Sequence, residues 1–370
     1  MSKNLSEIPF TEIVERASEL ARERSDVEKK IRGIINDVYV RELPRKEDWS
    51  FLVVSSALTL IERYNTGTVT ATTGGTTLTF SSDVTITSAM TGRKIKISGN
   101  DYVYDVTFAG TTSLTISPPL SGTQNVTSQS YDIFQSFYAL ASDYDRFLKD
   151  KGITKYTGGQ REVIPEKAMQ EFDRDYSATP TTYPTRCRLF GTDTNGRTLV
   201  EVNPPPKDAI SLAYDYIKRL VQMRETTAGF ITIEAGSTIV VGSAGTTLFT
   251  EAKTGDYFRV DAFGAGADSE WYRVQTITHN SSLTLSTAFG LSGASSAAYT
   301  ICSMPDIPTR LHPALLYGSL LQLITDQNDP NVENYKMQLA EVLTDGKRIY
   351  KTRVYSQELR MITEDYNYRR

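Results

Sequence analysis

The chain has few of the residues that build metal and disulfide sites. Of its 370 residues, two are histidines and two are cysteines. His279 and His312 have no cysteine, histidine or carboxylate companions at zinc-ligand spacing, so we expect no metal site. Cys187 and Cys302 are too few for the disulfide framework of a small secreted protein, although a single bridge stays open.

Long apolar runs and an excess of basic charge are also missing. The chain has no stretch of about 18 apolar residues, and its first residues lack the apolar region of a signal peptide, so we expect no membrane partner. The formal net charge is −4, whereas a protein that grips duplex DNA is more often basic. An aromatic content of 10% argues against general disorder. The length favours two or three folded domains.

Two glycine-bearing segments imitate functional loops. Residues 191–198 have the spacing of a phosphate-binding loop, but they lead into a strand pattern and three prolines, so we interpret them as a hairpin turn. Residues 261–270 offer carboxylates at a spacing that does not fit an EF-hand loop. Trp49 and Trp271 are interpreted first as core anchors. The sequence therefore predicts no catalytic residues, no cofactor and no enzyme activity.

One pattern occurs twice in the chain. Its first copy comprises the segments 91–97, 102–106, 112–117, 120–122 and 131–134. The second copy repeats them in the same order at 254–260, 271–274, 281–286, 291–293 and 299–302. Both copies alternate apolar and polar residues between glycine-bearing turns, which predicts short strands. A duplicated β module is more typical of an assembly component than of an enzyme.

Helical patterns flank the two copies. Residues 10–23 place apolar residues on one face, and a capping box at 25–28 starts a second helix that Pro44 ends. Pro313, suited to a first helical turn, opens a third helix, and a last one covers 332–350. The residues predicted to face inward are Ile13, Ala17, Leu20, Ala21, Val27, Ile31, Ile34, Ile35, Val38, Leu315, Leu316, Leu320, Leu323, Ile324, Tyr335, Leu339, Val342 and Leu343.

Strand patterns fill the remaining sequence. Residues 51–63 are apolar and β-rich enough for a strand, although a helix fits nearly as well. Strands near 186–190 and 198–203 flank an Asn-Gly pair, which is a strong hairpin signal. Residues 209–223 fit either a strand or a helix.

The sequence predicts an α+β fold with a helical core, helices at both termini and a small sheet. Two mainly-β modules of sandwich or barrel type are inserted into this core, because each module begins and ends within the scaffold. The predicted segments are 1–65 (N-terminal helices of the core), 66–134 (first module), 135–226 (mixed core segment), 227–303 (second module), 304–350 (C-terminal helices) and 351–370. The last segment has charges of both signs and no apolar stripe, so we interpret it as an extended arm.

Several segments together resemble the head-to-tail adaptor proteins of tailed bacteriophages. They are 34–39, 48–52, 138–144, 199–206 and two C-terminal helices containing Asp326 and Asp329. Such adaptors often read Tyr-x-Leu-Pro-x-Asp-Phe where this chain has 138–144, and Ala141 stands in place of the proline. The repeated element is similar to a small β domain of phage neck and tail proteins, with the pattern Gly-x-Tyr-Ile-Arg-Ile, Glu-Trp-Tyr-Arg-Ile and Ser-Leu-Thr-Leu.

The resemblance implies a structural virion protein of the neck or tail region, assembled in the host cytoplasm. It implies a ring, twelve-fold in such adaptors, that sits below the portal protein, joins capsid to tail and lines part of the DNA exit channel. Neighbouring copies, the portal and tail, nozzle or fibre proteins are the implied partners. Double-stranded DNA is expected to pass without tight binding, because a neutral or acidic lumen releases few counterions from it.

The resemblance also implies where partners bind. The arm residues expected to dock on the portal are Arg353, Tyr355, Arg360, Tyr366, Tyr368, Arg369 and Arg370. On the surface of the second module, the candidate partner-binding pair is Trp271 and Tyr272.

Three alternatives stay open. The first is another neck or tail component, such as a tail terminator, tube or fibre-attachment protein, although a tube protein is normally dominated by β structure. The second is a glycan-binding adhesive protein, for which Trp271 and Tyr272 are the candidate aromatic pair. The third is an enzyme with dispersed catalytic residues, which the scarcity of histidine and of catalytic motifs disfavours.

Overall fold

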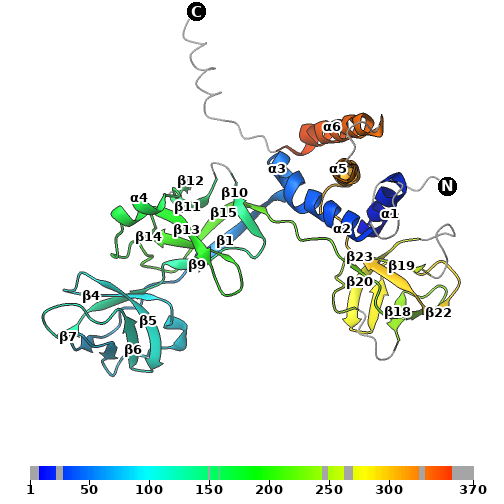
Figure 1. Cartoon of the computed structure of the whole chain (residues 1–370). Helices are drawn as coiled ribbons and strands as arrows, with labels where there is room; N and C mark the ends of the chain where they lie inside the picture. The colour runs from blue at the N-terminus through cyan, green and yellow to red at the C-terminus, as the bar shows by residue number, and fades with distance from the viewer. Residues whose placement is uncertain are drawn as a thin grey trace, which may run out of the picture. The chain divides into compact units, whose positions relative to one another are not determined.

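The computed structural model describes residues 8–21, 28–148, 151–157, 159–243, 249–261, 270–324 and 330–351. It contains helices and antiparallel sheets, which confirms the mixed α+β class (Figure 1). The chain divides into two compact units, Met1–Phe51 with Leu220–Arg370 and Leu52–Arg219. This division differs from a single core built of 1–65, 135–226 and 304–350, because it groups the helices with the second β module and the central strands with the first.

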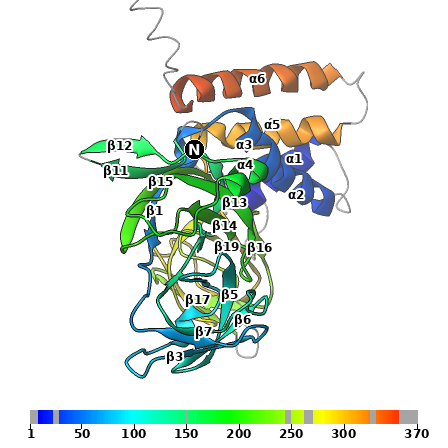
Figure 2. The ribbon, with the colours of Figure 1, turned by 90° about the vertical axis from the view of Figure 1, so that its left-hand side faces the viewer.

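The helices of the first unit pack around α5. They are α1 (Phe10–Ala21), α2 (Glu28–Asp37), α5 (His312–Leu323) and α6 (Pro330–Tyr350). α5 lies between α6 and the α1–α2 pair (Figures 1 and 2) and is apolar on nearly all sides, as a buried helix must be. Pro313 stands in its first turn, as predicted. None of the described helices is both long and apolar enough to cross a membrane.

Several helix predictions need correction. Pro44 does not end the second helix, because α2 continues through a π-helical turn (Val38–Glu42) into α3 (Leu43–Lys46). Pro44 stands in the first turn of α3, directly after the π-helical turn. Leu20 was predicted to face inward but is exposed near the end of α1. On α6 Tyr335 is buried, whereas the other predicted inward residues are only half-buried: Leu339, Val342 and Leu343.

Two small sheets form the core of the second unit outside the repeat. The five-stranded sheet contains β1 (Val53–Leu60), β10 (Tyr144–Phe147), β11 (Ile153–Thr157), β12 (Gln160–Val163) and β15 (Ile210–Lys218). The three-stranded sheet contains β9 (Phe137–Ala139), β13 (Arg186–Thr192) and β14 (Thr198–Asn203), and α4 (Met169–Arg174) lies beside β13. Both ambiguous segments are therefore strands, and β1 pairs antiparallel with β15 from Val53–Ile217 to Leu60–Ile210. The predicted hairpin of β13 and β14 is confirmed.

Apolar side chains from both sheets form one core cluster. On the five-stranded sheet these include Leu58, Leu60, Ile153, Leu212, Tyr214 and Tyr216. On the three-stranded sheet and its neighbours they include Tyr138, Leu140, Cys187, Val200 and Val202. The opposite face of β1 presents Ser55, Ala57 and Thr59 to solvent. Burial on one face only is typical of antiparallel sheets.

The repeated pattern corresponds to one strand order that occurs twice. The first module has the order β7-β2-β3-β6-β5-β4-β8, and the second has β22-β17-β18-β21-β20-β19-β23, followed by β16. The first module's strands are β2 (Val69–Ala71), β3 (Thr77–Phe80), β4 (Lys94–Ile97), β5 (Val103–Gly110), β6 (Ser113–Ser117), β7 (Val126–Gln129) and β8 (Tyr131–Phe134). The second module's are β16 (Glu225–Thr226), β17 (Ile231–Ile233), β18 (Ile239–Gly242), β19 (Tyr257–Val260), β20 (Tyr272–His279), β21 (Ser282–Leu285), β22 (Ala294–Ala297) and β23 (Tyr299–Cys302). Each module encloses its own apolar core.

Equivalent hydrogen bonds fasten the two modules. The Tyr104 hydroxyl accepts the N–H of Ser121 at 3.0 Å, and the Tyr272 hydroxyl accepts the N–H of Gly290 at 3.0 Å. Both tyrosines are buried in the cores of their modules. A buried hydroxyl that meets a backbone N–H satisfies two polar groups at once. The likeness of the two copies therefore extends from strand order to single hydrogen bonds.

One detail of the repeat alignment is corrected by these contacts. The carbonyl of Leu120 accepts the N–H of Gly74 at 2.9 Å, and the carbonyl of Phe289 accepts the N–H of Gly236 at 2.8 Å. Phe289, and not Leu291 as the sequence comparison suggested, is thus the counterpart of Leu120. Phe289 is buried like Leu120, whereas Leu291 packs at the margin of the core.

Candidate interaction surfaces

Trp271 and Tyr272, the predicted surface pair, have different environments. The Tyr272 ring is buried, its hydroxyl donates to the Glu270 carboxylate at 3.0 Å, and the prediction of a surface role for Tyr272 is therefore wrong. Strand alternation is the reason, because neighbouring residues point to opposite faces of the sheet. Trp271 is half-buried and lies under the guanidinium of Arg259, at 4.6 Å from the ring centroid. One face of its indole is thus occupied within the chain.

Several predicted features lie outside the described residues. They are the arm residues Arg353, Tyr355, Arg360, Tyr366, Tyr368, Arg369 and Arg370, the capping residues 25–27, most of the loop at 261–270, and Asp326 and Asp329. The arm segment is described only at Lys351, which forms an isolated bridge with Trp49.

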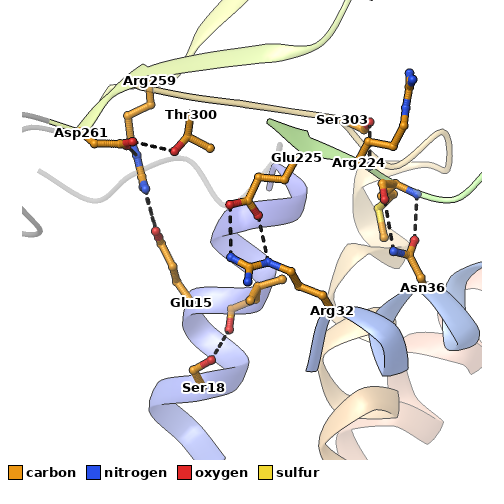
Figure 3. Close-up of polar contacts among 12 residues, drawn as sticks. Glu15, Ser18, Arg32, Asn36, Arg224, Glu225, Arg259, Asp261, Thr300 and Ser303 are labelled. Atoms are coloured by element: carbon orange, nitrogen blue, oxygen red, sulfur yellow. Dashed lines mark hydrogen bonds and ion pairs between the residues drawn. The ribbon is translucent and has the colours of Figure 1, made fainter. Parts of the chain in front are cut away.

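A set of polar contacts joins the second module to α2 (Figure 3). The Arg32 guanidinium makes two hydrogen bonds to the Glu225 carboxylate, at 3.1 and 3.2 Å. The Asn36 side chain accepts the N–H of Met223 at 2.8 Å and donates to the same residue's carbonyl at 3.2 Å. A guanidinium that makes two hydrogen bonds to one carboxylate, and an amide that both donates and accepts, fix the orientation of the two segments as well as their distance. These contacts set how the strand β16 leaves the helices.

A second set joins β19 and β23 to the start of α1. The N–H of Phe10 donates to the carbonyl of Ser303 at 3.1 Å, directly after β23. Arg259 on β19 forms ion pairs with Glu15 on α1 at 2.7 Å and with Asp261 at 3.3 Å (Figure 3). The helices therefore contact the β19–β23 side of the module.

The first module is held on the corresponding side. Tyr64, in the connection from β1, exchanges two backbone hydrogen bonds with Ile133 on β8, both at 2.8 Å. Arg63 pairs with Asp132 on the same strand at 2.8 Å. β8 is the counterpart of β23 in the strand order. Both modules thus use equivalent strands for attachment.

An exposed apolar patch distinguishes the second module from the first. Phe230, Ile239 and Val241 are 53%, 53% and 48% exposed, and Ile239 and Val241 lie on one face of β18. The equivalent positions of β3 in the first module are Thr77 and Thr79. A contiguous exposed apolar patch often marks a protein-binding site. The unbroken run of Ile239, Val240 and Val241 is the sequence signal that could have revealed it, because alternation alone would place a polar residue on either side of Val240.

The first module has a polar groove of about 400 Å³ between the loops 98–102 and 121–126. Asn100 fastens the two loops: its side chain donates to the carbonyl of Ser121 at 2.7 Å and accepts the N–H of Tyr102 at 2.9 Å. The Tyr102 ring lines the groove and is 56% exposed. The groove also contains amide and carboxylate side chains from Asp101, Gln124, Asn125 and Gln129. The sequence carries no signal of this groove, because its two loops meet only in the fold.

The 191–198 segment and His312 have structural roles. The 191–198 segment is a hairpin turn, in which the Asp193 carboxylate accepts the N–H groups of Asn195 and Arg197 at 2.9 and 2.8 Å. His312 is buried, and its Nδ1 accepts the N–H of Ile8 at 3.3 Å. No group of three metal-ligating side chains occurs among the described residues.

The two cysteines are buried and free, so the single bridge that the sequence left open is not formed. Burial raises the pKa of each thiol, Cys187 and Cys302, to about 12. A thiol in such surroundings stays protonated and behaves as a small apolar side chain.

Comparison of the chain with protein-family models, with curated proteins and with solved structures finds no match in any of the three. The interaction surfaces described above are therefore the basis for inferring a function.

Proposed function

We propose that this chain is a structural virion protein of a tailed phage, a head-to-tail adaptor that forms a ring below the portal. The observation that carries the proposal is the duplicated module: one strand order occurs twice, and equivalent strands attach each copy to its own unit. Two copies of one module presented from a common chain suit a protein whose task is to hold other proteins in place. The sequence resemblance to adaptors points in the same direction.

In this proposal the helices form the core of the ring, and the two modules are insertions that reach other virion proteins. The arm at 351–370 docks on the portal, and twelve copies close the ring through a contact that joins different surfaces of neighbouring subunits. DNA passes through without tight binding, in keeping with a net charge of −4.

The apolar patch of the second module supports a contact with a partner protein. The first module has threonines at the equivalent strand positions and therefore offers no such contact. Phe230, Ile239 and Val241 would pack against a tail, nozzle or fibre protein. Thr77 and Thr79 occupy the equivalent positions of β3 in the first module. Threonine is therefore the replacement to use at Ile239 and Val241, because the same strand of the first module already contains it. Ile239→Thr combined with Val241→Thr should abolish binding of the tail partner without lowering the melting temperature. Unchanged binding would exclude the patch as the docking surface.

Electron microscopy of the purified protein mixed with its cognate portal tests the main proposal. We expect an added ring at the narrow end of the portal, which also fixes the number of copies. Absence of any association would overturn the adaptor proposal. Removing 351–370 should abolish docking while far-ultraviolet circular dichroism stays unchanged, and normal docking of the shortened protein would exclude the arm as the portal contact.

A second candidate function, saccharide binding, is favoured by the polar groove of the first module. Sugar sites commonly combine an aromatic face with amide and carboxylate groups, because sugars present both C–H faces and hydroxyls. Tyr102 and the amides around Asn125 supply such groups. Tyr102→Ala should abolish binding on an oligosaccharide array, whereas Tyr156→Ala should not, although both rings are 56% exposed. An array with no bound saccharide would remove this candidate.

A further inference from the structure

Several sheet edges of the described chain are protected against additional strands. At β7 and β22, the outer strands of the modules, the pairing register shifts, and Ser128 and Ser296 have positive φ angles of 48° and 50°. Such bulges bend an edge and interrupt its row of hydrogen-bonding groups. β8 is bridged by Tyr64, and β13 is bridged by Glu166. The fold thus protects these edges by bulges or by cover.

The outer edge of β1 has none of these protections. β1 pairs with β15 on one side without a register shift, and no described strand pairs with its other side. Its sequence, Val-Val-Ser-Ser-Ala-Leu-Thr-Leu, contains no charge, proline or glycine. In an antiparallel pair, alternate residues direct both N–H and C=O away from the partner strand, so about four of each face the open edge. A long, regular, uncharged edge is a template for another strand.

The opposite end of the same sheet, β12, is open as well. β11 reaches β15 only through Ile153 and Thr154, and beyond them β11 and β12 form a two-stranded ribbon that extends away from the sheet (Figure 2). All residues of β12 are exposed. Arg161 fastens the ribbon through the Thr154 hydroxyl at 3.1 Å and the Asp215 carboxylate at 3.0 Å. An isolated two-stranded ribbon is marginally stable in water, so this one gains from a third strand.

The two open edges also complement each other in side-chain size. Arg161 and Val163 lie on one face of β12, beside Tyr156 of β11, and Val163 is 50% exposed. The corresponding face of β1 is identified by Ser55, whose hydroxyl donates to the same Asp215 carboxylate. Its exposed residues are small: Ser55, Ala57 and Thr59. Large side chains on one strand beside small ones on the next pack without a clash.

We propose that the β11–β12 ribbon of one copy adds β12 to the open edge of β1 on a second copy, so that the five-stranded sheet continues across the contact. Because the two edges lie at opposite ends of one sheet, the contact is heterologous and repeats from copy to copy. The inference deepens the proposed ring and rests on it for closure. The strand pairing itself requires only a second copy of the chain.

Disulfide trapping between single-cysteine variants tests the contact. Val163→Cys is mixed with Ser55→Cys, Ala57→Cys or Thr59→Cys under mild oxidation, so that the three β1 positions scan the register. Directly opposed residues of paired strands have Cβ atoms within about 5.5 Å, which is near disulfide reach. The native cysteines are buried and do not compete. We expect one mixture to form the mixed disulfide at least tenfold faster than Val163→Cys with Thr127→Cys, which lies on the bulged edge of β7.

Two outcomes would overturn the strand contact. One is a mixed disulfide no faster than that of the Thr127→Cys control, and the other is faster pairing of two β1 cysteines with each other. Portal binding separates this inference from the adaptor proposal. Ala57→Lys places a charge at the exposed edge of β1 and should prevent ring closure on the portal. A normal ring of Ala57→Lys would refute the strand contact and leave the adaptor proposal standing. Disulfide trapping in solution, combined with the absence of a wild-type ring on the portal, would support the strand contact and overturn the adaptor proposal.

Discussion

Replacing Trp49 by alanine should destabilise the helical unit by about 3–5 kcal/mol. The Trp49 side chain is fully buried, and its indole N–H donates to the carbonyl of Leu43 at 2.7 Å. Its ring stacks on Phe51 with centroids 5.7 Å apart. On α6 the residue that faces the indole is Gly346, where an added Cβ would lie 3.5 Å from the ring, and a glycine has no side chain with which to fill the space left by truncation. Most of the loss is therefore the cavity term, and about 1 kcal/mol is the hydrogen bond.

Urea denaturation followed by far-ultraviolet circular dichroism measures this loss. Fluorescence is unsuitable because Trp49 is one of only two tryptophans in the chain. Trp49→Phe is the matched control: it keeps an aromatic ring but leaves the Leu43 carbonyl without its donor, so it should cost about 1–3 kcal/mol. A cost below about 1 kcal/mol for Trp49→Ala would refute the buried role. Equal costs for both variants would refute the division between packing and hydrogen bonding.

Three further predictions concern the modules and the central sheet. Tyr104→Phe and Tyr272→Phe should each weaken their own module by about 1–2 kcal/mol, measured by amide hydrogen exchange, and an effect in only one would contradict their equivalence. Burial acts to raise the pKa of Asp215, but hydrogen bonds from Ser55 and Arg161 lower it below the ordinary 3.8, so this carboxylate stabilises the fold above that value and ceases to do so as the pH falls through its lowered pKa. Asp215→Asn should therefore flatten the acid limb of a stability–pH curve, and an unaltered limb would show that Asp215 contributes nothing. Replacing 229–301 by a short Gly-Ser bridge should preserve cooperative melting of the helices by circular dichroism, and its loss would show that the second module is not a separable insertion.

The repeat and most element types could be predicted from the sequence because their signals are local. Alternation around Leu114 and Leu283, with glycine-bearing turns between the runs, is enough to predict strands in both copies. Pro313 predicted the start of α5 for the same reason, since a helical first turn tolerates a missing N–H. These choices depend on a few neighbouring residues and need no information about the rest of the chain.

Other features depend on contacts between residues that are distant in the sequence, and only the tertiary structure decides them. β1 is a strand because residues 53–60 pair with 210–217, and the apolar run by itself fits a helix nearly as well. Alternation separates Trp271 from Tyr272 but does not say which of them faces the core, and the fold places the Tyr272 hydroxyl against the N–H of Gly290. The open edge of β1 and the small residues beside it likewise exist only once β15 has taken the other side. Local patterns determine which segments become strands, whereas pairing energy across long loops determines which faces and edges remain available to a partner.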